Sequence, residues 1–386
     1  MDLKDESLKL HRKLKGKLEI SGKCSINNTT DLSLLYTPGV AEASREIERN
    51  PDSVYEMTIK HNTVAIVSDG TRVLGLGDVG PEASLPVLEG KALIMKEFAN
   101  LDAFPIALKC KEPQEIVDVV RSISPVFGAI NLEDIETPKV FEVEKKLEDE
   151  LDIPVFHDDQ HGTAVVALAA LFNALKIVDK KLNKSKIAVV GSGSAGYGIT
   201  KLLLAAGADD VVCFDSAGAI GHHRSNLQKH KEELADISNK ESFQGTLSGF
   251  RNADVVISAA SPGALPSDTI KNMSSRKIVF ALANPMPEIS LEDAEKLGVE
   301  IYGSGRSDYP NQINNSLCFP GFLRALLDLR VRKITNGMKI AAARAIADVV
   351  SEKDLKKKKI VPDIFDKKVV PNIKAYIQKN IQESRE

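Results

Sequence analysis

Residues 186–196 read KIAVVGSGSAG, a short apolar strand pattern that runs directly into three spaced glycines. The spacing GxGxxG, followed by the helical pattern ITKLLLAAG, is typical of a dinucleotide-binding turn between a strand and a helix. Gly191 permits the tight turn, Gly193 lets the backbone approach a pyrophosphate, and Gly196 lets the helix pack closely on the strand. The residues expected to bind the dinucleotide phosphates are Gly191, Ser192, Gly193, Ser194, Ala195 and Gly196.

Asp215 ends the next strand pattern, VVCFD, and lies 24 residues after Gly191. This is near the ~20 residues expected for the acid that binds the ribose hydroxyls. A carboxylate there accepts hydrogen bonds from the ribose of NAD and repels the 2′-phosphate of NADP, so the sequence favours NAD. His222, His223 and Arg224 follow closely enough to leave NADP open as the alternative.

The alternation of apolar runs predicts the fold around this motif. Four strand patterns separated by helix-length intervals predict a doubly wound, mainly parallel sheet; they are residues 186–191, 209–215, 253–260 and 277–285. Upstream, residues 63–155 repeat a strand, loop, helix and strand pattern and predict a separate α/β unit. We therefore expect an α/β protein with an N-terminal α/β substrate domain, a Rossmann-like NAD(P)-binding domain and C-terminal helices that pack back; the expected ranges are 1–160, 161–330 and 331–386.

Composition excludes several classes of protein. The 386 residues contain 51 Lys plus Arg and 54 Asp plus Glu, and the net charge of −3 gives no general attraction for nucleic acid. The four cysteines lie far apart and indicate neither a disulfide framework nor a zinc site. The charged N-terminus lacks an apolar signal region, and from the sequence we expect no window to reach the ~18 apolar residues of a membrane span. We expect a cytoplasmic enzyme with no membrane partner.

Two acidic pairs mark a candidate metal site. Glu133 and Asp134 end one apolar run, and Asp158 and Asp159 end the next, so both pairs are expected at one sheet edge. Four acids there would repel each other unless a cation lay between them, and oxygen ligands favour Mg²⁺ or Mn²⁺ over zinc. The alternative for the second pair is a simple helix N-cap. The flanking His157 and His161 fit a supporting or capping role better than a ligand role.

Taken together, the motifs resemble the malic enzymes, in particular their short bacterial or archaeal form. The resemblance spans most of the chain and rests on eight ordered motifs: YTPGVA from Tyr36, VSDGTRVLGLGDVGP from Val67, EGKA around Lys91, NLED from Asn131, HDDQHGTA from His157, GSGSAG from Gly191, ANPMPE from Ala283 and GRSDYPNQINNSLCFPG from Gly305. No long N-terminal extension or phosphotransacetylase-like domain accompanies them, so regulatory sites of larger relatives are not carried over.

The resemblance implies roles for individual residues. It implies that Glu133, Asp134 and Asp159 bind the divalent metal. It makes Tyr36 and Lys91 the proton-transfer pair, with Asp158 as a supporting catalytic acid. It also assigns substrate binding to Lys91, Asn284 and Asn315, with Arg72 as a secondary candidate that could grip a carboxylate.

Each role has a structural alternative. Tyr36 before Thr37 and Pro38 could be an aromatic residue of a turn, and Lys91 could be an exposed helix lysine. Asn284 before a proline favours a turn, and Asn315 could bind only loop backbone. For the catalytic role, Lys91 must be neutral to accept a hydroxyl proton, which requires a lowered pKa.

The resemblance implies the oxidative decarboxylation of (S)-malate to pyruvate and CO₂, with reduction of NAD(P) and a requirement for Mg²⁺ or Mn²⁺. The alternative within the enzymes is a malolactic enzyme, which converts malate to lactate and retains its cofactor. The alternative outside the enzymes is a nucleotide-sensing module on the same fold. A homodimer is expected, with the apolar helices beyond Pro320 covering the cleft or forming the dimer face.

Overall fold

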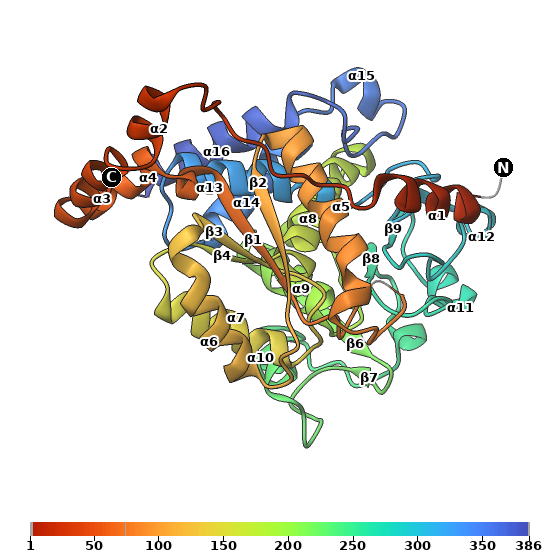
Figure 1. The fold of residues 1–386 in the computed structure, drawn as a ribbon. Coiled ribbons are helices and arrows are strands. Elements are labelled where there is room, and N and C mark those ends of the chain that lie inside the picture. The colour runs from red at the N-terminus through yellow and green to blue at the C-terminus, as the bar shows by residue number, and fades with distance from the viewer. Residues whose placement is uncertain (1–2, 74, 385–386) are drawn as a thin grey trace.

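The computed structural model describes residues 3–73 and 75–384 and contains two mainly parallel sheets, each covered by helices (Figure 1). The first sheet has the order β2-β1-β3-β4, and all its neighbouring strands are parallel. Its strands are β1 (Thr63–Ser68), β2 (Asp102–Ala107), β3 (Ala129–Leu132) and β4 (Val155–His157).

Helices bury both faces of this first sheet. Along β1, Val64 and Ile66 belong to one core cluster, whereas Ala65 and Val67 belong to another. Because every residue of β1 is buried, its sequence TVAIVS is nearly continuously apolar instead of alternating. The helices between its strands are α5 (Pro81–Ala99), α6 (Pro113–Ile123) and α7 (Lys139–Glu150).

The second sheet has the order β10-β9-β8-β5-β6-β7, and only the short β7 is antiparallel. The first strand, β5, lies between β6 and β8, so the chain reverses direction across the sheet there, which is where doubly wound sheets bind ligands. Its strands are β5 (Ile187–Val190), β6 (Val211–Asp215), β7 (Gly218–Ala219), β8 (Val255–Ser258), β9 (Lys277–Ala281) and β10 (Val299–Ser304). Its helices are α9 (Ser194–Ala205), α10 (Lys229–Ile237), α11 (Ser267–Lys271) and α12 (Leu291–Lys296).

A long apolar helix, α8 (Asp158–Val178), connects the two sheets and packs against α9 and α14. It is long and apolar enough to meet the criteria for a membrane span, contrary to the expectation from the sequence. However, 78% of the qualifying window is buried inside the molecule, as in the core helix of a folded protein. The helix begins at Asp158, so Asp158 and Asp159 occupy its first turn, where the helix dipole favours them.

The C-terminal helices pack back onto the body of the molecule as expected. They are α13 (Phe319–Asp328), α14 (Asn336–Ala347), α15 (Glu352–Leu355) and α16 (Val369–Glu383). Helix α13 contacts α5 and α16, and Phe322, Ile346 and Ile373 are fully buried in the largest core cluster. Apolar faces of these helices are therefore packed inside the chain, and the expectation that the helices cover the cleft or form a dimer face stays a prediction.

The N-terminal segment lies on the outside of the molecule. It contains α1 (Leu3–Leu14), α2 (Thr29–Leu35), α3 (Val40–Arg49) and α4 (Val54–Met57), and the first three helices have no buried residue. In Figure 1, α2 and α3 project at the upper left, whereas α1 lies on the right. The α/β class, the parallel sheets and the C-terminal helices are confirmed, whereas the exact domain boundaries stay a prediction.

Candidate active site

The two acidic pairs meet because β3 and β4 are adjacent parallel strands. Leu132 is in register with His157, so the residues that follow each strand emerge together at the carboxyl edge. Glu133, Asp134 and Asp159 each offer one oxygen, and these oxygens lie within 4.8 Å of one another. The backbone N–H of Asp134 also donates to Asp159 Oδ2 at 2.9 Å. The donor set is three carboxylates, which fits the oxygen preference of Mg²⁺ or Mn²⁺.

Lys91 of α5 projects between the two pairs. Its Nζ lies 2.5 Å from Glu133 Oε1, also contacts Asp158 Oδ2, and sits 4.7 Å from the centre of the Phe319 ring. The residue is only 8% exposed, so it is not the exposed helix lysine of the structural alternative. Burial alone would lower the pKa of Lys91, but the neighbouring carboxylates of Asp158 and Glu133 raise it above the ordinary value.

The carboxylates of Glu133 and Asp158 thus oppose the lowered pKa that the proton-transfer role of Lys91 requires, because both face its ammonium group. Burial in turn raises the pKa of Glu133 and that of Asp158. A divalent cation on the acids would favour their charged forms and disfavour the charge on Lys91. The residues present therefore fit a metal ion, and Lys91 fits a base that acts beside one.

A neighbouring amide orients Glu133. Asn131 is fully buried, and its Nδ2 donates to Glu133 Oε2 at 3.0 Å. Asn131 is not among the residues predicted for the site. Its spacing from Glu133 indicates the contact, because residues i and i+2 of a strand point to the same face.

Gly162 makes room for Asp158 and Asn315. It lies one helical turn after Asp158 in α8, and a Cβ added to it would lie 1.9 Å from Asp158 Oδ1 and 3.2 Å from the Cβ of Asn315. Asn315 begins the 3-10 helix η6 (Asn315–Leu317), and its side chain bonds Asp158 and opposes the effect of burial on the pKa of that acid. The structure thus brings Asn315 to the acids and Lys91.

The histidines of the HDDQHGTA motif lie next to acidic side chains. His157 is fully buried, and its Nε2 lies 3.8 Å from Asp159 Oδ2. His161 Nε2 lies 2.7 Å from Glu144 Oε1, and Lys339 Nζ lies 3.0 Å from His161 Nδ1. Burial lowers the pKa of each histidine. Within the described residues, the group of acids able to hold a metal includes neither histidine.

The glycine-rich loop has the geometry that a dinucleotide needs. Gly191 has φ +99°, which L residues rarely adopt, and a Cβ on Gly196 would lie 1.8 Å from the carbonyl oxygen of Gly191. Gly193 faces open space, with nothing within 4 Å of an added Cβ. Helix α9 begins immediately afterwards at Ser194, so its free N–H groups and dipole face the open side of the loop. The loop therefore fits the pyrophosphate of a dinucleotide.

Two cations hold Asp215 at the end of β6. Arg224 donates to both of its carboxylate oxygens, at 2.8 and 3.1 Å, and Lys231 Nζ donates to Oδ2 at 2.8 Å. Burial opposes ionisation, but the hydrogen bonds from Arg224 and Lys231 hold the pKa of Asp215 below its ordinary value. The sequence indicates that Arg224 lies near Asp215, whereas the contact with Lys231 was not predicted. Lys231 lies in the following helix, α10. Both the acid for a ribose diol and the cations for a 2′-phosphate are therefore present.

Asn284 and Arg72 lie at the edge of the site. Asn284 is exposed after β9, and its Nδ2 donates to the carbonyl of Gly305 at 3.1 Å. A Cβ added to Gly75 would lie 3.0 Å from the carbonyl of Asn284, so the loop after β1 reaches the second sheet. The backbone N–H of Arg72 donates to the carbonyl of Asp134 at 3.0 Å, and its side chain is exposed. Both side chains are exposed, and that of Asn284 is bonded to the loop that carries Gly305.

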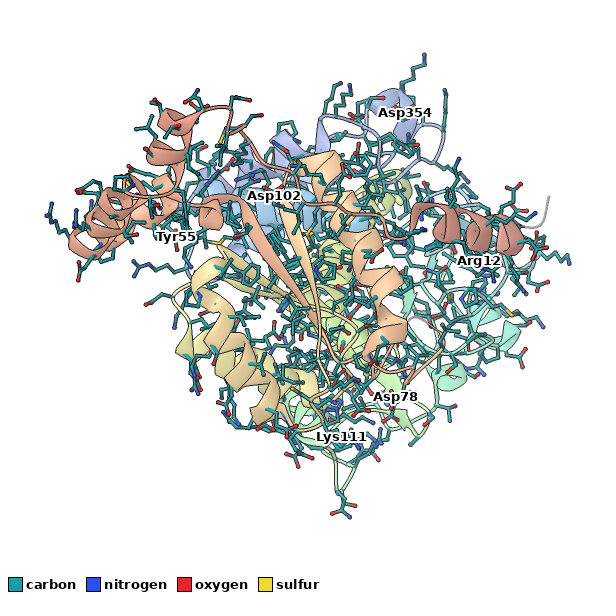
Figure 2. The ribbon with its side chains drawn as sticks, viewed as in Figure 1. Arg12, Tyr55, Asp78, Asp102, Lys111 and Asp354 are labelled. Atoms are coloured by element: carbon teal, nitrogen blue, oxygen red, sulfur yellow. The ribbon has the colours of Figure 1, made fainter. Side chains whose placement is uncertain are left out.

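Tyr36 lies apart from the other predicted residues. It follows α2 and is 62% exposed. Figure 2 shows Tyr55, near α2 and α3, at the left, whereas Asp78 and Lys111, which follow β1 and β2, lie at the bottom. In the described part of a single chain, no hydrogen bond or ion pair joins Tyr36 to Lys91. One chain alone does not place Tyr36 in the site.

Comparisons with known proteins agree with this geometry. Residues 15–148 match the family model for the malic enzyme N-terminal domain, and residues 160–381 match that for the malic enzyme NAD binding domain. An NAD-dependent malic enzyme of Geobacillus stearothermophilus is 51% identical over 378 residues, which cover 98% of this chain and 78% of the relative. A bifunctional malic/malolactic enzyme of Bacillus subtilis is 47% identical over 386 residues, which cover 100% of this chain and 94% of the relative.

Solved structures agree over the same length. The crystal structure of an NAD-dependent malic enzyme from Thermotoga maritima has a TM-score of 0.92 and 44% identity, and the match covers 96% of this chain and 98% of that one. The crystal structure of malic enzyme from Pyrococcus horikoshii has a TM-score of 0.92 and 43% identity, and the match covers 99% of this chain and 91% of that one. Since both domain models match and the similarity extends over nearly the whole length, the chain belongs to the malic enzyme family.

Proposed function

We propose that this chain catalyses the oxidative decarboxylation of malate to pyruvate and CO₂ with reduction of a nicotinamide dinucleotide, using Mg²⁺ or Mn²⁺. One arrangement carries the proposal: Lys91 is buried against Glu133 and Asp158, beside the oxygens of the three-carboxylate group. The loop that follows β3 and carries Glu133 and Asp134 is called the acidic loop. It contacts the glycine-rich loop, since Thr137 Oγ1 lies 2.8 Å from Ser194 Oγ. A base, a metal site and a dinucleotide site therefore adjoin one another.

Glu133, Asp134 and Asp159 would hold the ion. When bound, the ion supplies a Lewis acid for the negative charge that develops on the C2 oxygen as the C3 carboxylate leaves. A nicotinamide bound at the glycine-rich loop would supply the acceptor for the hydride of C2. Lys91 takes the proton of the C2 hydroxyl, and Asp158 and Phe319 keep its amine in place. Asn131 keeps the Glu133 carboxylate turned toward the ion.

Asn315 and Asn284 are proposed to hold the substrate carboxylates. Neutral amides donate hydrogen bonds without adding to the charge of an acidic site. Asn315 already lies beside Asp158, whereas Asn284 must turn from its bond to Gly305. Arg72 is the secondary candidate, because its exposed guanidinium is tethered through its backbone to the acidic loop and can bind a carboxylate with two hydrogen bonds.

NAD is the proposed cofactor, and NADP is the alternative. Asp215 remains an acceptor for a ribose diol, yet Arg224 and Lys231 neutralise the repulsion it would exert on a 2′-phosphate. Comparing kcat/KM for NAD and NADP decides between them. A Lys231→Gln variant that loses NADP turnover more than NAD turnover would show that the cations bind the phosphate.

We also propose a homodimer built on the N-terminal segment. Helices α1 to α3 bury no residue, and Ile20, Leu34 and Leu35 are among the apolar side chains they and their connection leave exposed. Exposed apolar surface of this extent marks an association site. Tyr36 lies on this segment, so a second copy could bring its tyrosine to Lys91 and complete the proton-transfer pair.

Mixing two inactive variants tests the dimer and the role of Tyr36 together. If Tyr36 acts on the partner's site, a 1:1 mixture of refolded Tyr36→Phe and Lys91→Ala chains regains about a quarter of wild-type activity, because half the dimers carry one intact site. If Tyr36 acts within its own chain, the mixture stays inactive. A monomer in light scattering would exclude the proposal.

The main test measures malate-dependent formation of reduced nicotinamide with and without Mn²⁺. Reduction that stops with a chelator and returns with metal supports the proposal, whereas metal-independent turnover would exclude the assigned acids. The Bacillus subtilis relative gives a reason to assay lactate as well. Lactate formed without net NADH would identify a malolactic enzyme, and nucleotide binding without any turnover would favour the nucleotide-sensing module.

A further inference from the structure

Thr137 joins the acidic loop to the glycine-rich loop. The acidic loop begins with Glu133 and Asp134 after β3, and Thr137 lies three residues beyond Asp134. Its Oγ1 lies 2.8 Å from Oγ of Ser194, and both residues are partly buried. Ser194 is the first residue of α9 and belongs to the GxGxxG motif. A single hydrogen bond thus spans from the segment of the metal acids to the segment of the phosphate site.

The acidic loop is held firmly enough to transmit a shift. The backbone N–H of Asp134 donates to Asp159 Oδ2 at 2.9 Å, and the carbonyl of Asp134 accepts from Arg72 at 3.0 Å. The N–H of Glu136, next to Thr137, donates to Thr71 Oγ1 at 2.9 Å. A change in the position of Asp134 therefore reaches Thr137 through a short backbone segment that is bonded on both sides.

A second contact continues the first. Phe141 in α7 and Tyr197 in α9 pack with ring centroids 4.6 Å apart. Tyr197 lies three residues after Ser194 on the same helix, so the two contacts follow one side of the first turn of α9. The aromatic contact keeps α7 and α9 together, and the hydroxyl contact fixes where the acidic loop meets the glycine-rich loop.

We propose that Thr137 is a positioning residue that couples the ion to the dinucleotide, so that each raises the affinity of the other. This rests on the proposed function only for the assignment of the two ligands to their loops. Whichever ligand binds first fixes the position of the shared segment, so the second ligand meets a loop that already has its bound position. Because such coupling is reciprocal, it can be read from either ligand.

The experiment measures the dissociation constant of NADH by fluorescence, once with a chelator and once with Mn²⁺. The coupling ratio is the constant in the chelator divided by the constant with Mn²⁺. No turnover is needed. Wild type is expected to bind NADH more tightly with Mn²⁺. Thr137→Val should reduce this ratio about two- to tenfold, the effect of one hydrogen bond, while binding in the chelator changes little. Thr137→Ser keeps the hydroxyl and should keep the ratio.

A double-mutant comparison separates coupling from direct binding. Ser194→Ala is expected to weaken NADH binding in both conditions and to lower the ratio, and the Thr137→Val, Ser194→Ala double variant should lower it no further. A wild-type ratio of one, an unchanged ratio in Thr137→Val, or an equal loss in Thr137→Ser each overturns the proposal. Failure of malate-dependent reduction would instead refute the proposed function, since the coupling is measured without substrate.

Discussion

A methyl group at Gly162 should slow the reaction strongly without disturbing the dinucleotide site. In α8 the side chain of Asp158 lies directly over Gly162, one turn later, as residues i and i+4 of a helix do. A Cβ at Gly162 would lie 1.9 Å from Asp158 Oδ1, whereas real Cβ contacts are essentially never under 3.0 Å. The carboxylate must therefore move by about 1 Å, and the added Cβ would also crowd Asn315, whose Cβ would lie 3.2 Å from it.

The displacement acts on catalysis through Lys91. Asp158 pairs with its amine, so a shift of the carboxylate moves the proposed base away from the substrate hydroxyl. A misplacement of 1 Å commonly lowers a rate by ~10²-fold. We expect Gly162→Ala to lower kcat with malate by about this factor, while the NADH dissociation constant in the presence of a chelator stays unchanged.

Gly90→Ala is the matched control. Gly90 is adjacent to Lys91 in α5, but an added Cβ there would meet only Lys17 Nζ, at 3.9 Å. This variant should keep its kcat and gain up to about 1 kcal/mol in unfolding free energy, because alanine favours a helix over glycine. A kcat for Gly162→Ala within threefold of wild type would refute the reasoning that the position of Asp158 governs Lys91.

Three further predictions concern the acids, the base and the interior. Asn131→Leu removes the amide that orients Glu133, so the Mn²⁺ concentration for half-maximal activity should rise about 10- to 100-fold; an unchanged requirement contradicts that role. Lys91→Met should lower kcat by ~10² to 10⁴ with NADH binding intact, and unchanged turnover removes Lys91 from the mechanism. Burial lowers the pKa of Lys339 to about 8 from 10.5 in the unfolded chain. Because the unfolded chain binds more protons between these values, wild-type stability in urea should rise with pH from about 8 to 10.5. Lys339→Met should flatten that rise, and equal slopes in the two proteins would show that Lys339 is not the cause.

Local patterns were sufficient for the α/β class and for the dinucleotide turn. Both depend on residues close in sequence: the run Ile187–Val190, the glycines after it, and the first turn of α9. The start of α8 was harder to predict, since Asp158 and Asp159 have low helix propensity and are favoured only because they face the helix dipole. The strand Val299–Ser304 was missed because it contains Glu300 and Gly303, which disrupt a continuous apolar run.

The electrostatics of the site could not be predicted from sequence spacing. Whether Lys91 is buried, and with which acids, depends on how α5 crosses the ends of β3 and β4, which lie more than 40 residues away in sequence. The contact between Thr137 and Ser194 was equally unpredictable from spacing, because the two residues follow strands of different sheets. The location of Tyr36 was also beyond local reasoning, because a turn motif does not indicate which surface, or which chain, it faces.

The charges of the acids proposed to bind the metal and the charge of Lys91 depend on one another. Glu133, Asp134 and Asp158 are almost fully buried, and one ammonium group cannot balance them together with Asp159. Burying unbalanced charge opposes folding, and a bound cation would relieve that cost. An ion that bound only the folded state would stabilise that state, so these carboxylates would supply its affinity. Such an ion would compete with Lys91 for Glu133, and a lysine with less counter-charge is more readily the neutral form that accepts a proton. On the proposed function, ion binding and activation of the base are therefore two consequences of a single pairing.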